Sequence, residues 1–225
     1  MTGTAGTVAR YTTIAGSHRH ELEVRRSRFI TVLQRVESED EVRDLLTRVR
    51  REFHDARHHC SAVVLGPSRE IQRANDDGEP SGTAGQPMLD AIIRRATSPD
   101  RADLSDLAAI VVRYFGGILL GAGGLVRAYS DSVSQALDAA PMITRERRQL
   151  LEIAAPSATA GRVENELRAV GTPVLAVHYE GELAHLTVAV DDDAAAMGSF
   201  SSRLAAITAG ELTAVPVSRE WVDRG

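Results

Sequence analysis

The stretch RYFGGILLGAGGLVRAYSDSV, residues 113–133, decides the fold. It continues a nearly unbroken apolar run, Leu107–Phe115, which predicts a buried strand in the centre of a sheet. Five of the chain's 18 glycines then fall between Gly116 and Gly124. Apolar residues at helical spacing follow and predict a helix over about 123–139. The stretch therefore predicts a strand, a glycine-rich turn and a helix.

A turn of this kind has two possible uses. The free N–H groups at the start of a helix can bind phosphate, and Arg113 and Arg127 on either side would add positive charge. The glycines are spaced G-G-x-x-x-G-x-G-G, which is neither a Walker A loop nor the dinucleotide-binding pattern. The same glycines can equally form a sharp corner that requires positive φ. Spacing alone leaves both uses open.

A second polar segment, NDDGEPSGTAGQP at residues 75–87, lies before another predicted helix. Close carboxylates can hold Mg²⁺ or Ca²⁺, but the EF-hand spacing is missing. Hydroxyls and glycines before a helix can also bind an anion. The alternative is a polar surface turn, although a connection of this length is long for that purpose. Its candidate side chains are Asp76, Asp77, Glu79, Ser81 and Thr83.

The segment FHDARHHC, residues 53–60, resembles half of a zinc site. His54 and His58 have helical i,i+4 spacing, but the sequence lacks a second cluster of ligands. A nucleophile at Cys60 served by His59 is disfavoured, because neighbouring residues on a strand point to opposite faces. We therefore expect no metal and no cofactor.

The other segments predict two α+β domains. Residues 1–16 are expected to be a flexible N-terminus, followed by a first domain over 17–142 and a second over 145–225. In the first domain we expect strands over 27–36 and 60–66, and a helix over 39–53 that begins with a capping box. The second domain has the order β-α-β-β-α-β, which is ferredoxin-like.

The bulk composition excludes several classes of protein. The chain has 225 residues, 43% of them hydrophobic, a net charge of −5 and no lysine. Neither half is basic overall, so a polyanion would have to bind a local patch of arginines. A single cysteine, no secretory signal and no apolar run long enough to span a membrane predict a cytoplasmic protein.

Four motifs resemble those of the YigZ/Impact family: SRFI, DARHHCSAVVLG, DDGEPSGTAGQPML and VVRYFGGILLGAGGLVRAYSDSV. They span Ser27 to Val133. The resemblance implies a first domain with the ribosomal-protein-S5-domain-2-like fold and a second domain similar to domains of translation elongation factors. Relatives in eukaryotes regulate translation under amino-acid starvation by binding the activator of a kinase. They use an extra N-terminal domain that we do not expect here.

The resemblance and the polar segments together indicate a set of site residues in all four motifs. We expect a non-enzymatic, translation-associated protein that binds RNA or the ribosome in a groove between the two motif loops, with a protein partner for the second domain as a possibility. A Mg²⁺-dependent nucleotide- or phosphate-binding enzyme using the same loops, and a purely protein-binding regulator, remain as alternatives. The expected ligand-binding residues are Arg28, His58, Asp76, Asp77, Glu79, Ser81, Thr83, Arg113, Tyr114, Gly116, Gly117, Gly121, Gly124, Arg127 and Tyr129.

Overall fold

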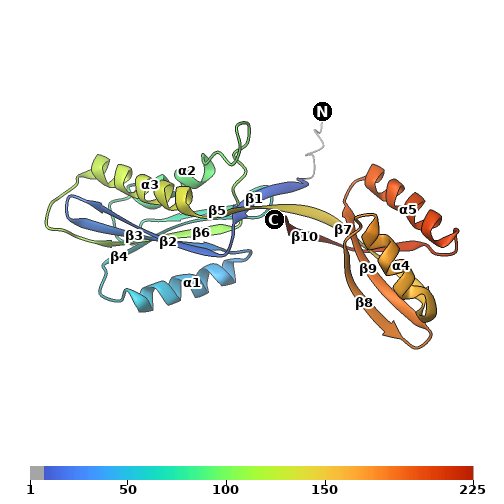
Figure 1. Ribbon diagram of the computed structural model, residues 1–225. Helices are drawn as coiled ribbons and strands as arrows, with labels where there is room; N and C mark the ends of the chain where they lie inside the picture. The colour runs from blue at the N-terminus through green and yellow to red at the C-terminus, as the bar shows by residue number, and fades with distance from the viewer. Residues whose placement is uncertain (1–7, 225) are drawn as a thin grey trace. The chain divides into compact units, whose positions relative to one another are not determined.

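The computed structural model describes residues 8–224, and these residues form two compact units. The N-terminal unit is Arg10–Thr144, and the C-terminal unit is mainly Arg145–Arg224. The chain is a mixed α/β protein with two antiparallel sheets (Figure 1). In the described part of the chain, no helix is both long and apolar enough to cross a membrane.

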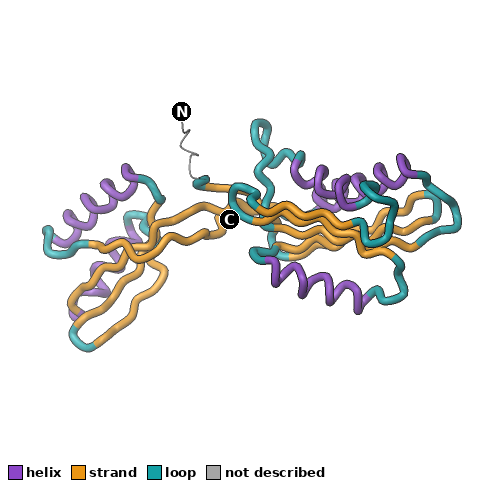
Figure 2. The backbone as a smooth tube through the Cα atoms, turned by 180° about the vertical axis from the view of Figure 1, so that it is seen from behind, coloured by secondary structure: helices purple, strands orange, loops and turns teal. Residues whose placement is uncertain are grey.

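The N-terminal unit has one antiparallel sheet with the strand order β2-β3-β6-β4-β5. Helix α1 covers one face of this sheet, and α2 and α3 cover the other (Figures 1 and 2). The elements of this unit are β1 (Arg10–Ile14), β2 (Ser17–Val24), β3 (Ser27–Arg35), α1 (Glu39–Glu52), β4 (His58–Leu65), β5 (Ile71–Asn75), α2 (Gly85–Ile93), β6 (Leu107–Tyr114) and α3 (Ala122–Ala139).

Strand β6 is central, as its apolar sequence predicts, and separates two hydrophobic cores. Alternate residues of β6 enter each core: Val111 faces α2 and α3, whereas Val112 faces α1. The strand is buried from Leu107 to Arg113 and delivers Arg113 and Tyr114 to one end of the sheet. Half of the predicted capping box is present: Ser38 Oγ accepts a hydrogen bond from the Glu41 backbone N–H, whereas the Glu41 carboxylate accepts one from the Glu37 backbone N–H.

The start of the chain corrects the expectation of a flexible segment over residues 1–16. Residues 1–7 lie outside the described part, but β1 is a strand in which Tyr11 is fully buried and hydrogen-bonded to Asp106. Strand β2 was also missed. It lies at the edge of the sheet with its residues alternating between exposed and half-buried, so its sequence, SHRHELEV, lacks the apolar signal of a buried strand.

The C-terminal unit has the predicted order β-α-β-β-α-β, with its strands side by side as β10-β7-β9-β8. Helices α4 and α5 pack against the same face of this sheet and share one hydrophobic core. Strand β7 begins at Met142, before residue 145, where the second domain was predicted to start. The elements are β7 (Met142–Pro156), α4 (Ser157–Ala169), β8 (Val174–Glu180), β9 (Leu183–Asp191), α5 (Ala194–Thr208) and β10 (Ala214–Arg224).

Candidate functional site

A buried polar network joins the two long motifs. Arg113, the last buried residue of β6, donates a hydrogen bond from Nη1 to Glu79 Oε1 at 2.7 Å. Tyr129 of α3 donates its hydroxyl to the same oxygen at 2.8 Å. Tyr129 points inward because it lies on the apolar face of α3, where its ring meets Phe29 edge to face. The two motifs therefore lie close together, as predicted, but they meet in a buried contact and not across an open groove.

Cys60 extends this network from β4. Its Sγ lies 3.3 Å from the Tyr129 hydroxyl and 3.0 Å from the Asp76 carbonyl oxygen. Burial raises the pKa of the Cys60 thiol to about 12, and burial also raises the pKa of Tyr129. Both groups are neutral at physiological pH. A thiolate nucleophile at Cys60 is therefore disfavoured.

Asp76 organises the loop between β5 and α2. Its carboxylate accepts backbone N–H groups of Gly82 at 2.7 Å, Ala84 at 3.0 Å and Gly85 at 2.8 Å. Burial alone would raise the pKa of Asp76, but the three hydrogen bonds prevail and lower it. The residue thus closes the loop and satisfies the N–H groups of Ala84 and Gly85 at the start of α2.

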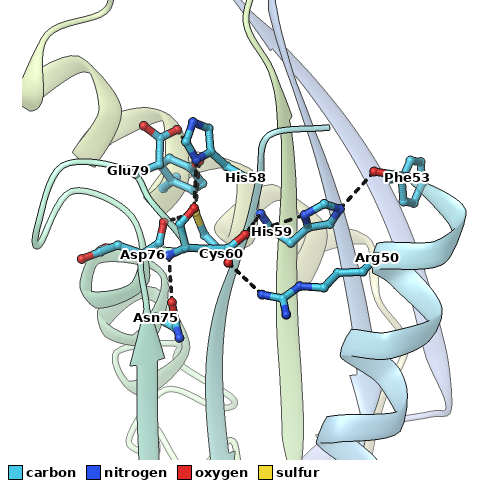
Figure 3. A network of polar contacts seen from close by, with 10 residues as sticks. Arg50, Phe53, His58, His59, Cys60, Asn75, Asp76 and Glu79 are labelled. Carbon is cyan, nitrogen blue, oxygen red and sulfur yellow. Dashed lines mark hydrogen bonds and ion pairs between the residues drawn. The ribbon is translucent and has the colours of Figure 1, made fainter. Parts of the chain in front are cut away.

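Asp77 joins this loop to α1 and β4. Its side chain accepts hydrogen bonds from Arg50 Nη2 and from the His59 backbone N–H, each at 2.7 Å. The Asp77 carbonyl oxygen is 2.9 Å from His58 Nδ1, and His59 Nε2 is 3.1 Å from the Phe53 carbonyl (Figure 3). The two histidines thus contact separate backbone groups. Across residues 8–224, no three His, Cys, Asp or Glu side chains are grouped so that they could hold a metal ion.

The glycine turn has structural reasons for its composition. A Cβ on Gly116 would lie 2.0 Å from the carbonyl carbon of Arg26, so only glycine fits there. Gly117 and Gly121 have φ of +85° and +72°, and Gly121 is the N-cap of α3. A Cβ on Gly124 would lie 3.1 Å from Leu120 Cβ. The turn is therefore at least a sharp corner.

An open groove of about 400 Å³ lies beside this corner. Phe115 is 53% exposed at its edge, and the Arg113 guanidinium carbon is 5.7 Å from the centre of the Phe115 ring. The groove thus combines an exposed aromatic face with cationic side chains. Its lining residues are Asp55, Arg57, His58, Arg113, Tyr114, Phe115 and Leu119.

Tyr114 is fixed at the groove by two neighbours. Its hydroxyl donates to Asp55 Oδ1 at 2.6 Å, and this hydrogen bond lowers the pKa of Asp55 and raises that of Tyr114. The Arg28 guanidinium lies 5.6 Å from the centre of the Tyr114 ring and forms a two-point ion pair with Glu21. Arg28 thus lies next to the groove without lining it.

The structure does not bring all the predicted residues to this groove. Asp76, Asp77 and Glu79 contribute to the fold with their carboxylates, and Thr83 is buried with its hydroxyl donating to the Pro80 carbonyl. Ser81 is exposed, and so is Arg127; neither lines the groove. Sequence reasoning missed four lining residues as site residues: Asp55, Arg57, Phe115 and Leu119. The sequence offered one signal for two of them, because Phe115 and Leu119 are apolar residues next to the glycines of the turn.

Comparisons with known proteins agree with the motif resemblance. Residues 25–137 match the Impact N-terminal domain family. The chain is 38% identical over 207 residues to the IMPACT family member YvyE of Bacillus subtilis (strain 168), covering 90% of this chain and 92% of that protein. It is 45% identical over 117 residues to the IMPACT family member YigZ of Escherichia coli (strain K12), covering 51% of this chain and 54% of YigZ. A crystal structure described only as that of a hypothetical protein matches with a TM-score of 0.62 and 32% identity, over 93% of this chain and 98% of the other.

Proposed function

Because this chain belongs to the IMPACT family, we propose that it is a cytoplasmic, translation-associated regulator that binds single-stranded RNA, free or on the ribosome. The binding site is the groove defined by Asp55, Arg57, His58, Arg113, Tyr114, Phe115 and Leu119. We further propose the ribosomal-protein-S5-domain-2-like fold for the N-terminal unit and the ferredoxin-like fold for the C-terminal unit, which the strand order β10-β7-β9-β8 supports.

The observation that carries the proposal is Phe115, whose exposed ring stands in a groove with the guanidinium of Arg57. An exposed aromatic beside cationic side chains suits a nucleic acid, because a base can stack on the ring while the guanidinium reaches a phosphate. Because the chain has a net charge of −5, its surface as a whole does not attract RNA, and binding requires a local site where positive side chains gather.

Fluorescence anisotropy with a short single-stranded RNA, over a range of salt concentrations, tests the proposal. We expect affinity to fall as salt rises. Phe115→Ala should weaken binding by about tenfold, in line with base–aromatic stacking. Arg57→Gln should weaken binding and reduce the salt slope by about 1. Arg73→Gln is the matched control, because Arg73 is exposed on β5 and lies outside the groove.

Three results would contradict RNA binding at this groove. They are no binding at low salt, equal binding by the Phe115→Ala variant, and equal weakening by the Arg73→Gln control. A protein captured by the wild type and lost with Phe115→Ala, without RNA binding, would favour the purely protein-binding regulator. Saturable, Mg²⁺-dependent nucleotide binding abolished by Asp77→Asn would favour the enzyme. Against that alternative, the carboxylates of Asp76, Asp77 and Glu79 already accept hydrogen bonds within the fold.

A further inference from the structure

A second groove lies on the α1 face of the N-terminal sheet, between α1 and the strands β2 and β3. Its volume is about 470 Å³, which is within the range of small-molecule sites. It shares no lining residue with the groove at Phe115. Its lining residues are Ser17, Arg19, Val32, Gln34, Leu45, Arg48, Val49, Arg51 and Glu52.

The floor of this groove is apolar and rigid. Val32 of β3 and Leu45 and Val49 of α1 are at least 97% buried and belong to the core between the sheet and α1. Because these side chains are fixed by packing, the groove keeps its floor without a ligand. The three side chains are nearly closed to solvent, so a ligand in this groove meets mainly the polar side chains of the rim.

Arginines form the rim. The Arg19 guanidinium is held by Glu52 through two hydrogen bonds of 2.5 and 2.6 Å, and its carbon lies 5.9 Å from the centre of the Phe53 ring. Arg48 Nη2 donates to Gln34 Oε1 at 2.8 Å. Arg51 is exposed, and the structure of residues 8–224 shows no hydrogen bond or ion pair from it.

The charges of this rim do not cancel. Glu52 is the only carboxylate among the lining residues, against three arginines, so the rim carries a net charge of about +2 at neutral pH. The hydrogen bond with Arg19 lowers the pKa of Glu52, so this carboxylate stays ionised. A guanidinium has five N–H donors, and the pairing with Glu52 uses only two of those of Arg19.

We propose that this arginine groove binds the phosphates of a nucleotide, which Arg48 and Arg51 hold at the rim. Guanidinium groups match phosphate oxygens in a two-point geometry, and Ser17 and Gln34 offer further hydrogen bonds at the rim. Arg48 and Arg51 would supply the positive charge that the phosphates need, so the proposal requires no divalent cation. The site is independent of the proposed RNA groove.

Isothermal titration of the full chain with ADP, GDP and inorganic pyrophosphate, in EDTA, tests the proposal. We expect saturable binding of at least one nucleotide. The Arg48→Gln/Arg51→Gln double variant should bind it at least about tenfold more weakly, because charge-assisted hydrogen bonds are lost. The matched control is Arg43→Gln, since Arg43 is exposed on the same helix and does not line the groove.

Each other outcome overturns the proposal. Absence of binding by both nucleotides, or equal weakening by Arg43→Gln, excludes the arginine groove as the site. Binding of a nucleotide without binding of pyrophosphate means that the arginines of the rim do not hold the phosphates. Phe115→Ala, which tests the RNA groove, should leave nucleotide affinity unchanged. A loss of nucleotide binding in that variant would place the nucleotide in the other groove.

Discussion

Arg113 and Glu79 form a buried ion pair that links the central strand β6 to the loop before α2, with Nη1 of Arg113 2.7 Å from Oε1 of Glu79. Their side chains are only 8% and 3% exposed. Arg113 Nε is buried and has no hydrogen-bond partner in the described part of the chain. Such a pair is weak evidence for stability as a whole, but the loss of one partner leaves a buried charge unpaired.

We therefore expect Glu79→Ala to destabilise the N-terminal unit by about 3–5 kcal/mol. Because a chain with two compact units need not unfold in a single step, native-state hydrogen exchange of the β6 amides is the suitable measurement. Arg94→Ala, at an exposed i,i+4 pair with Asp90 in the same unit, should cost only about 0.3–0.5 kcal/mol. The double variant Arg113→Met/Glu79→Leu should recover most of the loss. A cost below about 1 kcal/mol for Glu79→Ala would contradict this account.

Asp76 predicts a pH dependence of stability. Its pKa is lowered in the folded protein, where it accepts three backbone N–H groups, relative to about 3.9 in the unfolded chain. Its contribution is therefore fully present above pH 3.9 and is lost as pH falls through the folded pKa. Urea unfolding between pH 6 and pH 3 should show a steeper loss for the wild type than for Asp76→Asn. Parallel curves for the two proteins would count against this role of Asp76.

Much of the architecture could be predicted from local patterns. The apolar run of β6, the capping box of α1 and the glycine turn before α3 each carry a strong signal, and all three elements are present. Strand β2 could not be found in this way, because an edge strand with half-exposed residues needs no apolar alternation. It pairs with β3 as a hairpin whose two-residue turn is Arg25 and Arg26, both at positive φ, so the turn lacks the glycine or asparagine that normally signals such a hairpin.

The candidate site was harder to predict because spacing does not say which way a side chain points. Glu79 lies in a polar segment typical of a surface turn, yet it is buried against Arg113 and Tyr129. Phe115 follows a buried strand, yet it is exposed because β6 ends at Tyr114 and Gly116 packs against Arg26. Both orientations depend on tertiary contacts with distant residues.

The glycines of the turn should differ sharply in their tolerance of alanine. Gly116→Ala should strongly destabilise the N-terminal unit, because its Cβ would lie 2.0 Å from the Arg26 carbonyl carbon and 2.5 Å from the Ser27 nitrogen. Gly123→Ala has open space and a helical position, so it should stabilise the unit by up to about 1 kcal/mol. Thermal unfolding of the two variants measures the contrast. Similar melting temperatures for both would mean that the turn is looser than the packing of Gly116 indicates.

Cys60 should be unreactive in the folded protein. Its side chain is fully buried beside Tyr129, and burial raises the pKa of the thiol to about 12, so almost no thiolate is present at pH 8. A disulfide reagent at pH 8 should therefore modify the native chain only at the rate at which the N-terminal unit opens. In denaturant the same thiol should react at the rate of a free cysteine. Glu79→Ala should speed modification in the native protein, because it removes one partner of the Tyr129 hydroxyl and destabilises the surrounding core. Rapid modification of the wild type at pH 8 would show that the network around Cys60 opens readily, and it would weaken the stability argument for Arg113 and Glu79 as well.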